Sequence, residues 1–187
     1  MEMSVLHRGR PADLTGRLPI EVACYGLLDG LGIAYGRVDH EHADTIAACE
    51  LVEGVLGAKI CKNLFLCNRQ KTKFYLLVMD GEKPFHTKDL SKQIGSSRLS
   101  FAPAEEMVRL LGTAPGSASI LGLMNDIAHE VTLLLDAPVT RMETFGCHPC
   151  RNTTSLVLPM ADVLGKLLPH LGVEPVVVDL PDDRDAD

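Results

Sequence analysis

Residues 59–79, KICKNLFLCNRQKTKFYLLVM, decide the fold. Two apolar runs, 59–67 and 73–79, are rich in the β-branched, aromatic and aliphatic residues that favour strands. A short polar and basic segment separates them. The pattern predicts two strands joined by a turn, at the centre of the domain.

Helical patterns flank this pair of strands. Pro19 suits a first helical position, and Thr45 suits the N-cap of a helix that closes near Gly57. Gly112 suits the left-handed end of a helix that begins after Pro103. The other predicted helices lie near 87–94 and 161–168, and the other strands at 34–38, 130–136, 153–158 and 176–180. The elements intersperse without strict alternation, which predicts an α/β fold: a single compact domain with a curved mixed β-sheet surrounded by helices.

The 187 residues suit one domain. We expect an N-terminal extension at 1–18, the domain itself at 19–181 and an acidic tail at 182–187. The chain has no apolar run near the ~20 residues of a membrane span, and its first residues lack the features of a secretory signal. The sequence therefore predicts a cytoplasmic protein without a membrane partner. Cys24, Cys49, Cys61 and Cys67 lie among apolar neighbours and are expected to be small buried hydrophobic residues.

The charge is unevenly distributed. The net charge is −7, yet residues 59–98 hold nine Lys/Arg against three acids and carry +6, which leaves −13 for the remainder. Such a basic segment fits contact with a few phosphates better than wrapping of a long polymer, so DNA is not an expected partner. A solvated lysine-rich hairpin without a partner explains the same charges. Aromatic residues make up 4% of the chain, which argues against a broad base-stacking sheet.

Lys62 and Asn63 place a cation and an amide at the head of the first strand. If Leu64 and Leu66 face one side, Lys62 shares that side and can open onto a pocket, where its ammonium would hold a phosphate or sugar oxygen. A strand-end lysine that simply reaches solvent is the alternative.

A glycine-rich turn follows at 112–117, GTAPGS. Gly112 and Gly116 permit unusual dihedrals, Pro115 stiffens the turn, and Ser117 follows it. Free backbone N–H groups in such a turn can hold a carbonyl oxygen that becomes negative during attack. Alone, the motif is equally compatible with an ordinary turn.

His148 lies in a proline-stiffened segment, FGCHPCRN, at 145–152. Together with Asn152, the imidazole could orient water, bind an amine or form a pocket wall; it could equally be satisfied by turn backbone. Cys147 and Cys150 form a CxxC pair, but the residues after it predict a turn into a strand, unlike a redox site, and no second ligand pair for zinc is apparent. The sequence shows no nucleophile motif.

Six motifs together resemble a known family, the YbaK-type aminoacyl-tRNA deacylases, which are related to the editing insertion domain of bacterial prolyl-tRNA synthetase. The resemblance runs from about Tyr35 to Leu180 and is greatest to the free-standing branch, PrdX or ProXp-ala, that clears alanine from proline tRNA. The motifs are Asp44-Thr45, Lys62–Leu66, Arg98–Ala102, Leu111–Ser117, Leu121–Asp126 and His148–Asn152.

The resemblance implies hydrolysis of the ester between a wrong amino acid and the terminal adenosine of tRNA, with Ala-tRNA(Pro) as substrate and no metal or organic cofactor. The implied partners are the acceptor end of tRNA(Pro) and a prolyl-tRNA synthetase. In the implied site the catalytic residues are Lys62, Gly116 and His148, and the substrate-binding residues are Thr45, Asn63, Gly112, Pro115, Ser117 and Asn152. The attacking species would be water, positioned by the ribose 2′-OH.

Two departures from the family pattern affect this site. Cys147 and Cys150 flank the histidine, and Ala48 stands where the family often has Glu. A synthetase cannot strongly reject an amino acid smaller than the correct one, because a missing methylene changes the binding free energy by only ~1–3 kcal/mol. A second site that excludes the larger, correct amino acid and hydrolyses the smaller one would supply the selectivity. We expect this pocket near Thr45, Ile46, Leu121 and His148. The alternatives are a deacylase for tRNA mischarged with Cys or Ser, and a non-catalytic module that binds tRNA or a synthetase.

Overall fold

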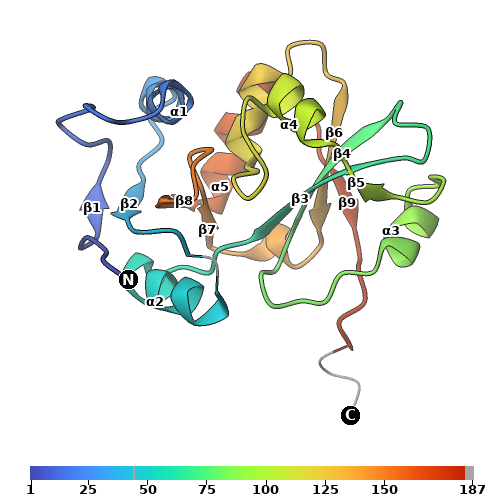
Figure 1. Cartoon of the computed structure of the whole chain (residues 1–187), viewed down its shortest axis with the longest axis horizontal. Helices are drawn as coiled ribbons and strands as arrows, with labels where there is room; N and C mark the ends of the chain where they lie inside the picture. The colour runs from blue at the N-terminus through green and yellow to red at the C-terminus, as the bar shows by residue number, and fades with distance from the viewer. Residues whose placement is uncertain (44, 184–187) are drawn as a thin grey trace.

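Two β-sheets lie side by side in the computed structural model, which describes residues 1–43 and 45–183 (Figure 1). Asp44 and most of the expected acidic tail at 182–187 lie outside this part. The first sheet is antiparallel, in the order β1 (His7–Arg8), β2 (Gly36–Asp39), β8 (Thr154–Pro159), β7 (Thr144–Cys147). The second is mixed, in the order β5 (Ser100–Phe101), β3 (Lys62–Cys67), β4 (Phe74–Met79), β6 (Val131–Asp136), β9 (Val176–Val178).

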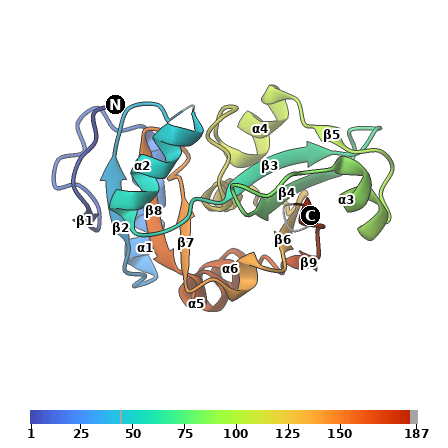
Figure 2. The ribbon, with the colours of Figure 1, turned by 90° about the horizontal axis from the view of Figure 1, so that it is seen from below.

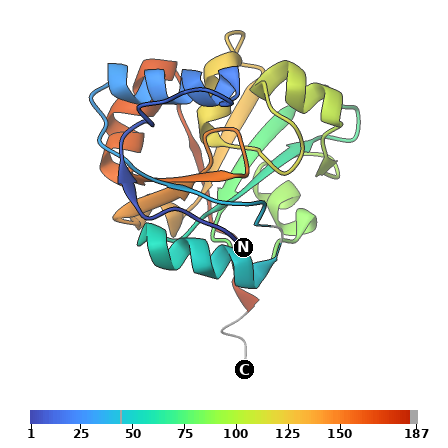
Figure 3. The same ribbon diagram turned by 60° about the vertical axis from the view of Figure 1, so that its left-hand side comes forward.

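Helices cover these sheets. Helices α1 (Pro19–Gly30) and α2 (Ile46–Leu56) lie above and below the strands of the first sheet (Figure 3). The remaining α-helices are α3 (Thr87–Gln93), α4 (Ala104–Leu111), α5 (Met160–Asp162) and α6 (Leu168–Leu171). Two 3-10 helices, η1 (Ile120–Asn125) and η2 (Val139–Arg141), and one π-helical turn, η3 (Val163–Leu167), complete the helical segments. Among the described residues, no helix is both long and apolar enough to cross a membrane.

The predicted strand pair is confirmed. β3 and β4 are antiparallel, with Lys62 opposite Met79 and Cys67 opposite Phe74. β3 begins at Lys62 rather than at residue 59, because Ile60 leaves this sheet and forms a parallel bridge with Gly146 of β7. That bridge joins the two sheets.

The local helix signals are also confirmed at three positions. The Thr45 hydroxyl accepts a hydrogen bond from the Ala48 N–H at 3.2 Å and caps α2. Gly57 and Gly112 end α2 and α4 in the left-handed conformation, with φ of 72° and 67°. α3 begins at Thr87, but its N-cap is His86, which makes no side-chain capping bond.

Two apolar clusters form the core. The larger lies between the sheets and under α1, α4 and η1, and includes Tyr25, Phe65, Leu111 and Phe145. The smaller lies on the opposite face of the mixed sheet, where Leu90 of α3 packs with Leu66 and Leu77. Apolar residues occupy every position of β4 because both faces of this strand are covered.

The α/β class and the single-domain architecture are confirmed, but the strands form two sheets rather than one curved sheet. Three strands, β1, β5 and β7, were not predicted. Each has two to four residues and lies outside any longer apolar run such as 176–180, from which β9 was predicted. β1 belongs to the expected N-terminal extension and pairs with the edge of β2, His7 opposite Arg37.

Candidate functional site

A cleft of about 460 Å³ lies where the two sheets meet. β3 begins near the middle of the molecule, next to β7, and runs away from the first sheet (Figure 2). The start of β3, the edge strand β5, helix α4, the 115–118 turn and the end of β7 surround the cleft. The lining residues are Cys61, Lys62, Asn63, Leu64, Phe65, Phe101, Ala102, Met107, Pro115, Gly116, Ala118 and His148.

Lys62 is half-buried at the head of β3, between this cleft and a second hollow on the α2 side that it also lines. Its ammonium donates a hydrogen bond of 2.7 Å to the backbone carbonyl of Lys83. The Lys83 side chain is itself anchored by a buried ion pair with Asp136, Nζ to Oδ2 at 2.8 Å. Lys62 is therefore held in place, and an ammonium retains two further N–H groups for a ligand.

Asn63 contributes an unsatisfied acceptor. Its Nδ2 donates to the Cys61 carbonyl at 3.0 Å, whereas its Oδ1 is buried and has no hydrogen-bond partner among the described residues. An acceptor left in this state costs about 1–3 kcal/mol. Because Asn63 lines the cleft, a ligand N–H or O–H is the natural partner of Oδ1.

The turn at 114–117 presents a backbone donor. Ser117 N–H binds the Ala114 carbonyl at 3.1 Å, Pro115 holds the second position, and Gly116 has a φ of 86°. This is a type II turn, in which the third position needs a positive φ and favours glycine. The Gly116 N–H has no partner among the described residues, and Gly116 lines the cleft, so the turn can bind a carbonyl oxygen.

His148 is oriented by its Nδ1, which lies 3.0 Å from the Thr154 carbonyl and 3.4 Å from the Ser155 hydroxyl. A carbonyl accepts only, so we assign the proton to Nδ1, which leaves Nε2 as an acceptor. Burial is the largest cause that lowers the pKa of His148 below its usual 6.5, and nearby His40 acts in the same direction. The imidazole is neutral at pH 7 and can accept a proton or hydrogen bond from a ligand.

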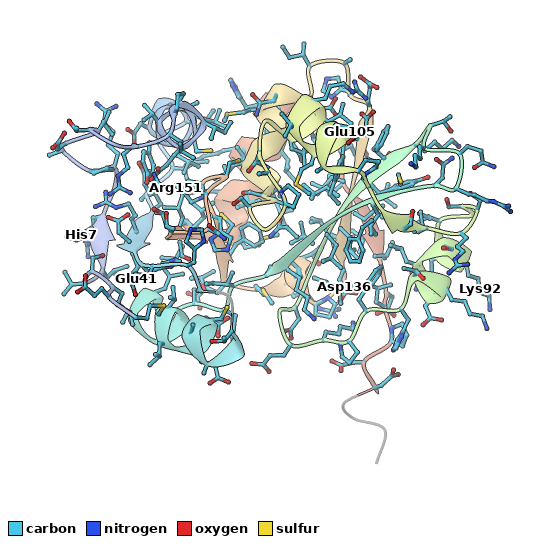
Figure 4. All side chains as sticks on the ribbon, viewed as in Figure 1. His7, Glu41, Lys92, Glu105, Asp136 and Arg151 are labelled. Carbon is cyan, nitrogen blue, oxygen red and sulfur yellow. The ribbon has the colours of Figure 1, made fainter. Side chains whose placement is uncertain are left out.

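A charged network beneath β8 supports this histidine. The Thr154 hydroxyl lies 3.3 Å from Glu21 and 3.1 Å from Asp39, and Arg17 contacts both carboxylates at 2.7 Å. Burial would raise the pKa of Glu21, but hydrogen bonds from Tyr25 and Arg17 outweigh it and hold that pKa below its usual value. Arg151, labelled in Figure 4, adds a contact to Glu21 at 3.3 Å. Both carboxylates therefore stay ionised and fix the chain around Thr154.

The cysteines offer no reactive thiolate at the cleft. Burial raises the pKa of Cys61, which lines the cleft, to about 12, and also raises that of Cys147. All six cysteines are free thiols. Cys24, Cys61 and Cys67 are buried as predicted, and Cys49 is half-buried. Cys24 and Cys150 lie with their sulfurs 3.9 Å apart. In the described part of the chain, no three His, Cys, Asp or Glu side chains are arranged to hold a metal ion.

The structure brings together five of the nine predicted site residues: Lys62, Asn63, Pro115, Gly116 and His148. The other four line neighbouring hollows. Gly112, Ser117 and Asn152 share one on the far side of the turn, where the Asn152 amide lies near Gly116, and Thr45 lines the hollow that Lys62 borders. Leu121 is fully buried in the core, and the side chain of Ile46 lies outside the described part.

Sequence reasoning missed several residues of the site. Phe101, Met107 and Ala118 line the cleft, and Ser155 and Lys83 hold the site residues. Only Phe101 lies in a motif that the sequence singled out, at 98–102. The others come from a helix, a buried strand and two loops whose proximity depends on the tertiary structure.

The fold and the cleft define a single-domain α/β protein in which a cation, a backbone amide and an imidazole line one cleft. The model of the aminoacyl-tRNA editing domain matches residues 40–165. The prolyl-tRNA editing protein ProX of Acetoanaerobium sticklandii is 32% identical over 136 residues, 73% of this chain and 83% of ProX. The prolyl-tRNA synthetase associated domain-containing protein 1 of Bos taurus is 27% identical over 144 residues, 74% of this chain and 83% of the relative.

Among solved structures, a candidate trans-editing enzyme for prolyl-tRNA synthetase superimposes with a TM-score of 0.65 at 19% identity, covering 88% of this chain and 98% of the other. The likeness is one of fold. The chain belongs to the aminoacyl-tRNA editing domain family.

Proposed function

We propose that the protein is a trans-editing aminoacyl-tRNA deacylase and that its substrate is Ala-tRNA(Pro). The supporting observation is that one cleft is lined by three groups without a hydrogen-bond partner in the described part of the chain: the Gly116 N–H, the Asn63 Oδ1 and the His148 Nε2. Family membership and the names of the relatives support the same reaction. We assign the activity to the domain at 19–181, which contains the matched residues 40–165.

The three groups match an aminoacyl ester. In the proposed complex the ester carbonyl oxygen accepts from Gly116 N–H, where negative charge develops during attack. Asn63 Oδ1 accepts from the α-ammonium or a ribose hydroxyl, and His148 Nε2 accepts from the attacking water. Lys62 holds the phosphate of the terminal nucleotide, as a compact cation at the head of a strand can.

The attacking oxygen comes from water. It bonds to the acyl carbon, the bond from that carbon to the ribose oxygen breaks, and the proton of water ends on the ribose oxygen. The products are the free amino acid and uncharged tRNA. Cys61 is a poor alternative nucleophile, because a pKa of about 12 leaves roughly one thiolate in 10⁵ at pH 7.

Selectivity for a small amino acid is proposed to come from the apolar walls of the cleft. Phe65, Met107 and Ala118 line it, and each is more than nine-tenths buried. Buried walls cannot move aside for a larger side chain without strain. This assignment replaces the pocket expected around Leu121, which lies in the core.

A panel of charged tRNAs tests the proposal. Purified protein should hydrolyse Ala-tRNA(Pro) and spare Pro-tRNA(Pro) and Ala-tRNA(Ala). Lys62→Ala and Asn63→Ala should each lower kcat/KM by roughly 10²-fold, as loss of a group that stabilises the transition state does. Lys166→Ala, which removes an exposed lysine paired with Asp162, should match the wild type.

Each other outcome has a defined meaning. Hydrolysis confined to Cys- or Ser-charged tRNA would replace the substrate and keep the reaction. Binding of charged tRNA without faster hydrolysis would establish a non-catalytic module. A Cys61→Ala variant should keep its rate within about ten-fold, whereas abolished turnover in a folded variant would indicate covalent catalysis. A prolyl-tRNA synthetase is proposed as a further partner on the names of the relatives alone.

A further inference from the structure

Phe101 is an exposed aromatic side chain at the rim of the cleft. It is 67% exposed, whereas Phe65, Phe74 and Phe145 are each at most 5% exposed. It lines the same cleft as Gly116 and His148. Because most large apolar residues of this chain are buried, an exposed phenylalanine beside a ligand cleft is informative.

The fold does not need this side chain. The backbone holds β5 in place through the pairing of Phe101 with Leu66 and a hydrogen bond of 3.0 Å from the Ala102 N–H to the Phe65 carbonyl. Neither apolar cluster of the core includes Phe101. The ring is therefore free to contact a ligand that enters the cleft.

Phe101 shares a face of the mixed sheet with Lys62. Side chains alternate along β3, so Lys62, Leu64 and Leu66 point to one side, and Phe101 lies opposite Leu66. Four strand residues, roughly 13 Å, separate Lys62 from the position beside Phe101. This is the face that α3 covers, and Lys62 and Phe101 both line the cleft at the edge of β3. A strand of RNA with its ester in the cleft and a phosphate at Lys62 would therefore pass beside the ring.

Unpaired cations continue beyond Phe101. Arg69 and Arg98 line one hollow with Ser100, the neighbour of Phe101. Lys71 is exposed in the adjacent β3–β4 turn. No described carboxylate lies within 4.0 Å of these three side chains, in contrast to Arg109, which contacts Glu106 and Glu130.

The same end of the molecule carries Lys92 on α3 (Figure 4). The net charge of the protein is −7, yet no described carboxylate pairs with these cations beside the aromatic ring. They present the two features that single-stranded nucleic acid requires, a positive track and a stacking surface.

We propose that Phe101 stacks on a base of the unpaired 3′ end of tRNA, and that Arg98 and Arg69 bind phosphates of the strand that leads to it. The inference rests on the proposed function and extends it, because it states how the RNA part of the substrate is held. A single ring suffices for one base and needs no broad stacking sheet.

The stacking is tested with an RNA acceptor-stem hairpin ending in unpaired CCA, uncharged, and carrying 2-aminopurine in place of the last or, separately, the preceding base. Wild-type protein should quench the fluorescence of one of the two probes. Phe101→Ala should abolish the quench and weaken binding roughly five- to one-hundred-fold. Phe101→Tyr should retain both, and Phe101→Leu should lose the quench.

The phosphate contacts are tested by salt dependence. Arg98→Ala and Arg69→Ala should each reduce the slope of log Kd against log salt by about 0.7–0.9. Arg8→Ala, an exposed arginine on β1 of the other sheet, should leave that slope unchanged. Unaltered quench in Phe101→Ala, or equal slopes in all variants, would overturn the inference.

Deacylation assays separate this inference from the proposed function. If the wild type hydrolyses charged tRNA while Phe101→Ala has unchanged KM, only the inference fails. If the wild type hydrolyses no charged tRNA, the proposed function fails, and the hairpin measurements still decide whether Phe101 and Arg98 bind RNA.

Discussion

Lys83→Met should destabilise the protein far more than loss of an ordinary surface ion pair. The ammonium of Lys83 lies 2.8 Å from Asp136, and the two side chains are 3% and 0% exposed. Asp136, labelled in Figure 4, ends β6, and its second oxygen accepts the Leu180 N–H at 3.0 Å. Methionine keeps most of the apolar stem and removes the ammonium, so a carboxylate is left buried without its cation.

The structure sets the magnitude. Removal of one partner of a buried pair costs about 3–5 kcal/mol, because the remaining charge loses its compensation. For a chain of this size each kcal/mol lowers Tm by ~2–4 °C, so we expect a decrease of roughly 6–20 °C. The double variant Lys83→Met/Asp136→Asn removes both charges and keeps an oxygen for Leu180. It should regain at least about 2 kcal/mol of the loss.

Urea unfolding with linear extrapolation and thermal melts measure these free energies. Lys166→Met is the control, because Lys166 and Asp162 form an exposed pair at 3.0 Å that is worth at most ~0.5 kcal/mol. A Lys83→Met variant no less stable than this control would show that the Lys83–Asp136 pair is not a buried, compensated pair. A double variant less stable than Lys83→Met would refute the argument from uncompensated charge.

Three further outcomes are expected. The pKa of His148 is lowered by folding, so as pH falls the unfolded chain binds this proton before the folded chain does. The stability that neutral His148 contributes should therefore be complete above pH 6.5 and decline as pH falls toward the folded-state pKa. Thermal melts of the wild type and His148→Gln from pH 7.5 to 5 measure this decline, and parallel curves of Tm against pH would contradict it. Ala118→Leu should fill the cleft and abolish alanine clearance without unfolding, so an unchanged rate would place the amino acid elsewhere. Gly146→Ala should lower the free energy of unfolding by about 1–3 kcal/mol or more, because a Cβ at residue 146 would lie 2.3 Å from the Lys59 carbonyl oxygen. Gly165→Ala, where a Cβ would meet nothing within 4 Å, should leave the free energy of unfolding measured in urea unchanged.

Local rules predicted the elements that local interactions define. The Thr45 cap and the glycine ends of α2 and α4 depend on residues within one or two helical turns of each other. The β3–β4 pair joins two neighbouring segments of the chain. The division into two sheets depends instead on the pairing of residue 36 with residue 157 and of residue 74 with residue 131. No periodicity in the sequence encodes such partners.

The site was predictable to the same extent. Lys62, Gly116 and His148 belong to short motifs whose residue types suggest chemistry, and the structure places all three on one cleft. Their supports were not predictable. Ser155 contacts His148 and also binds His40, from a distant strand end, at 2.9 Å, and the Lys83 carbonyl that holds Lys62 belongs to a loop without any motif.

The junction of the two sheets explains why the motifs meet. Cys61 N–H binds the Gly146 carbonyl at 3.2 Å, and Gly146 N–H binds the Lys59 carbonyl at 3.1 Å, so the chain segments just before Lys62 and His148 run side by side. Such close contact leaves no room for a side chain at residue 146. Since β3 and β7 otherwise belong to different sheets, this bridge sets the spacing between the cation and amide of one strand and the imidazole of the other. A shift of the bridge would separate these groups without altering any of them, and the glycine is therefore as necessary to the proposed site as the residues that touch the ester.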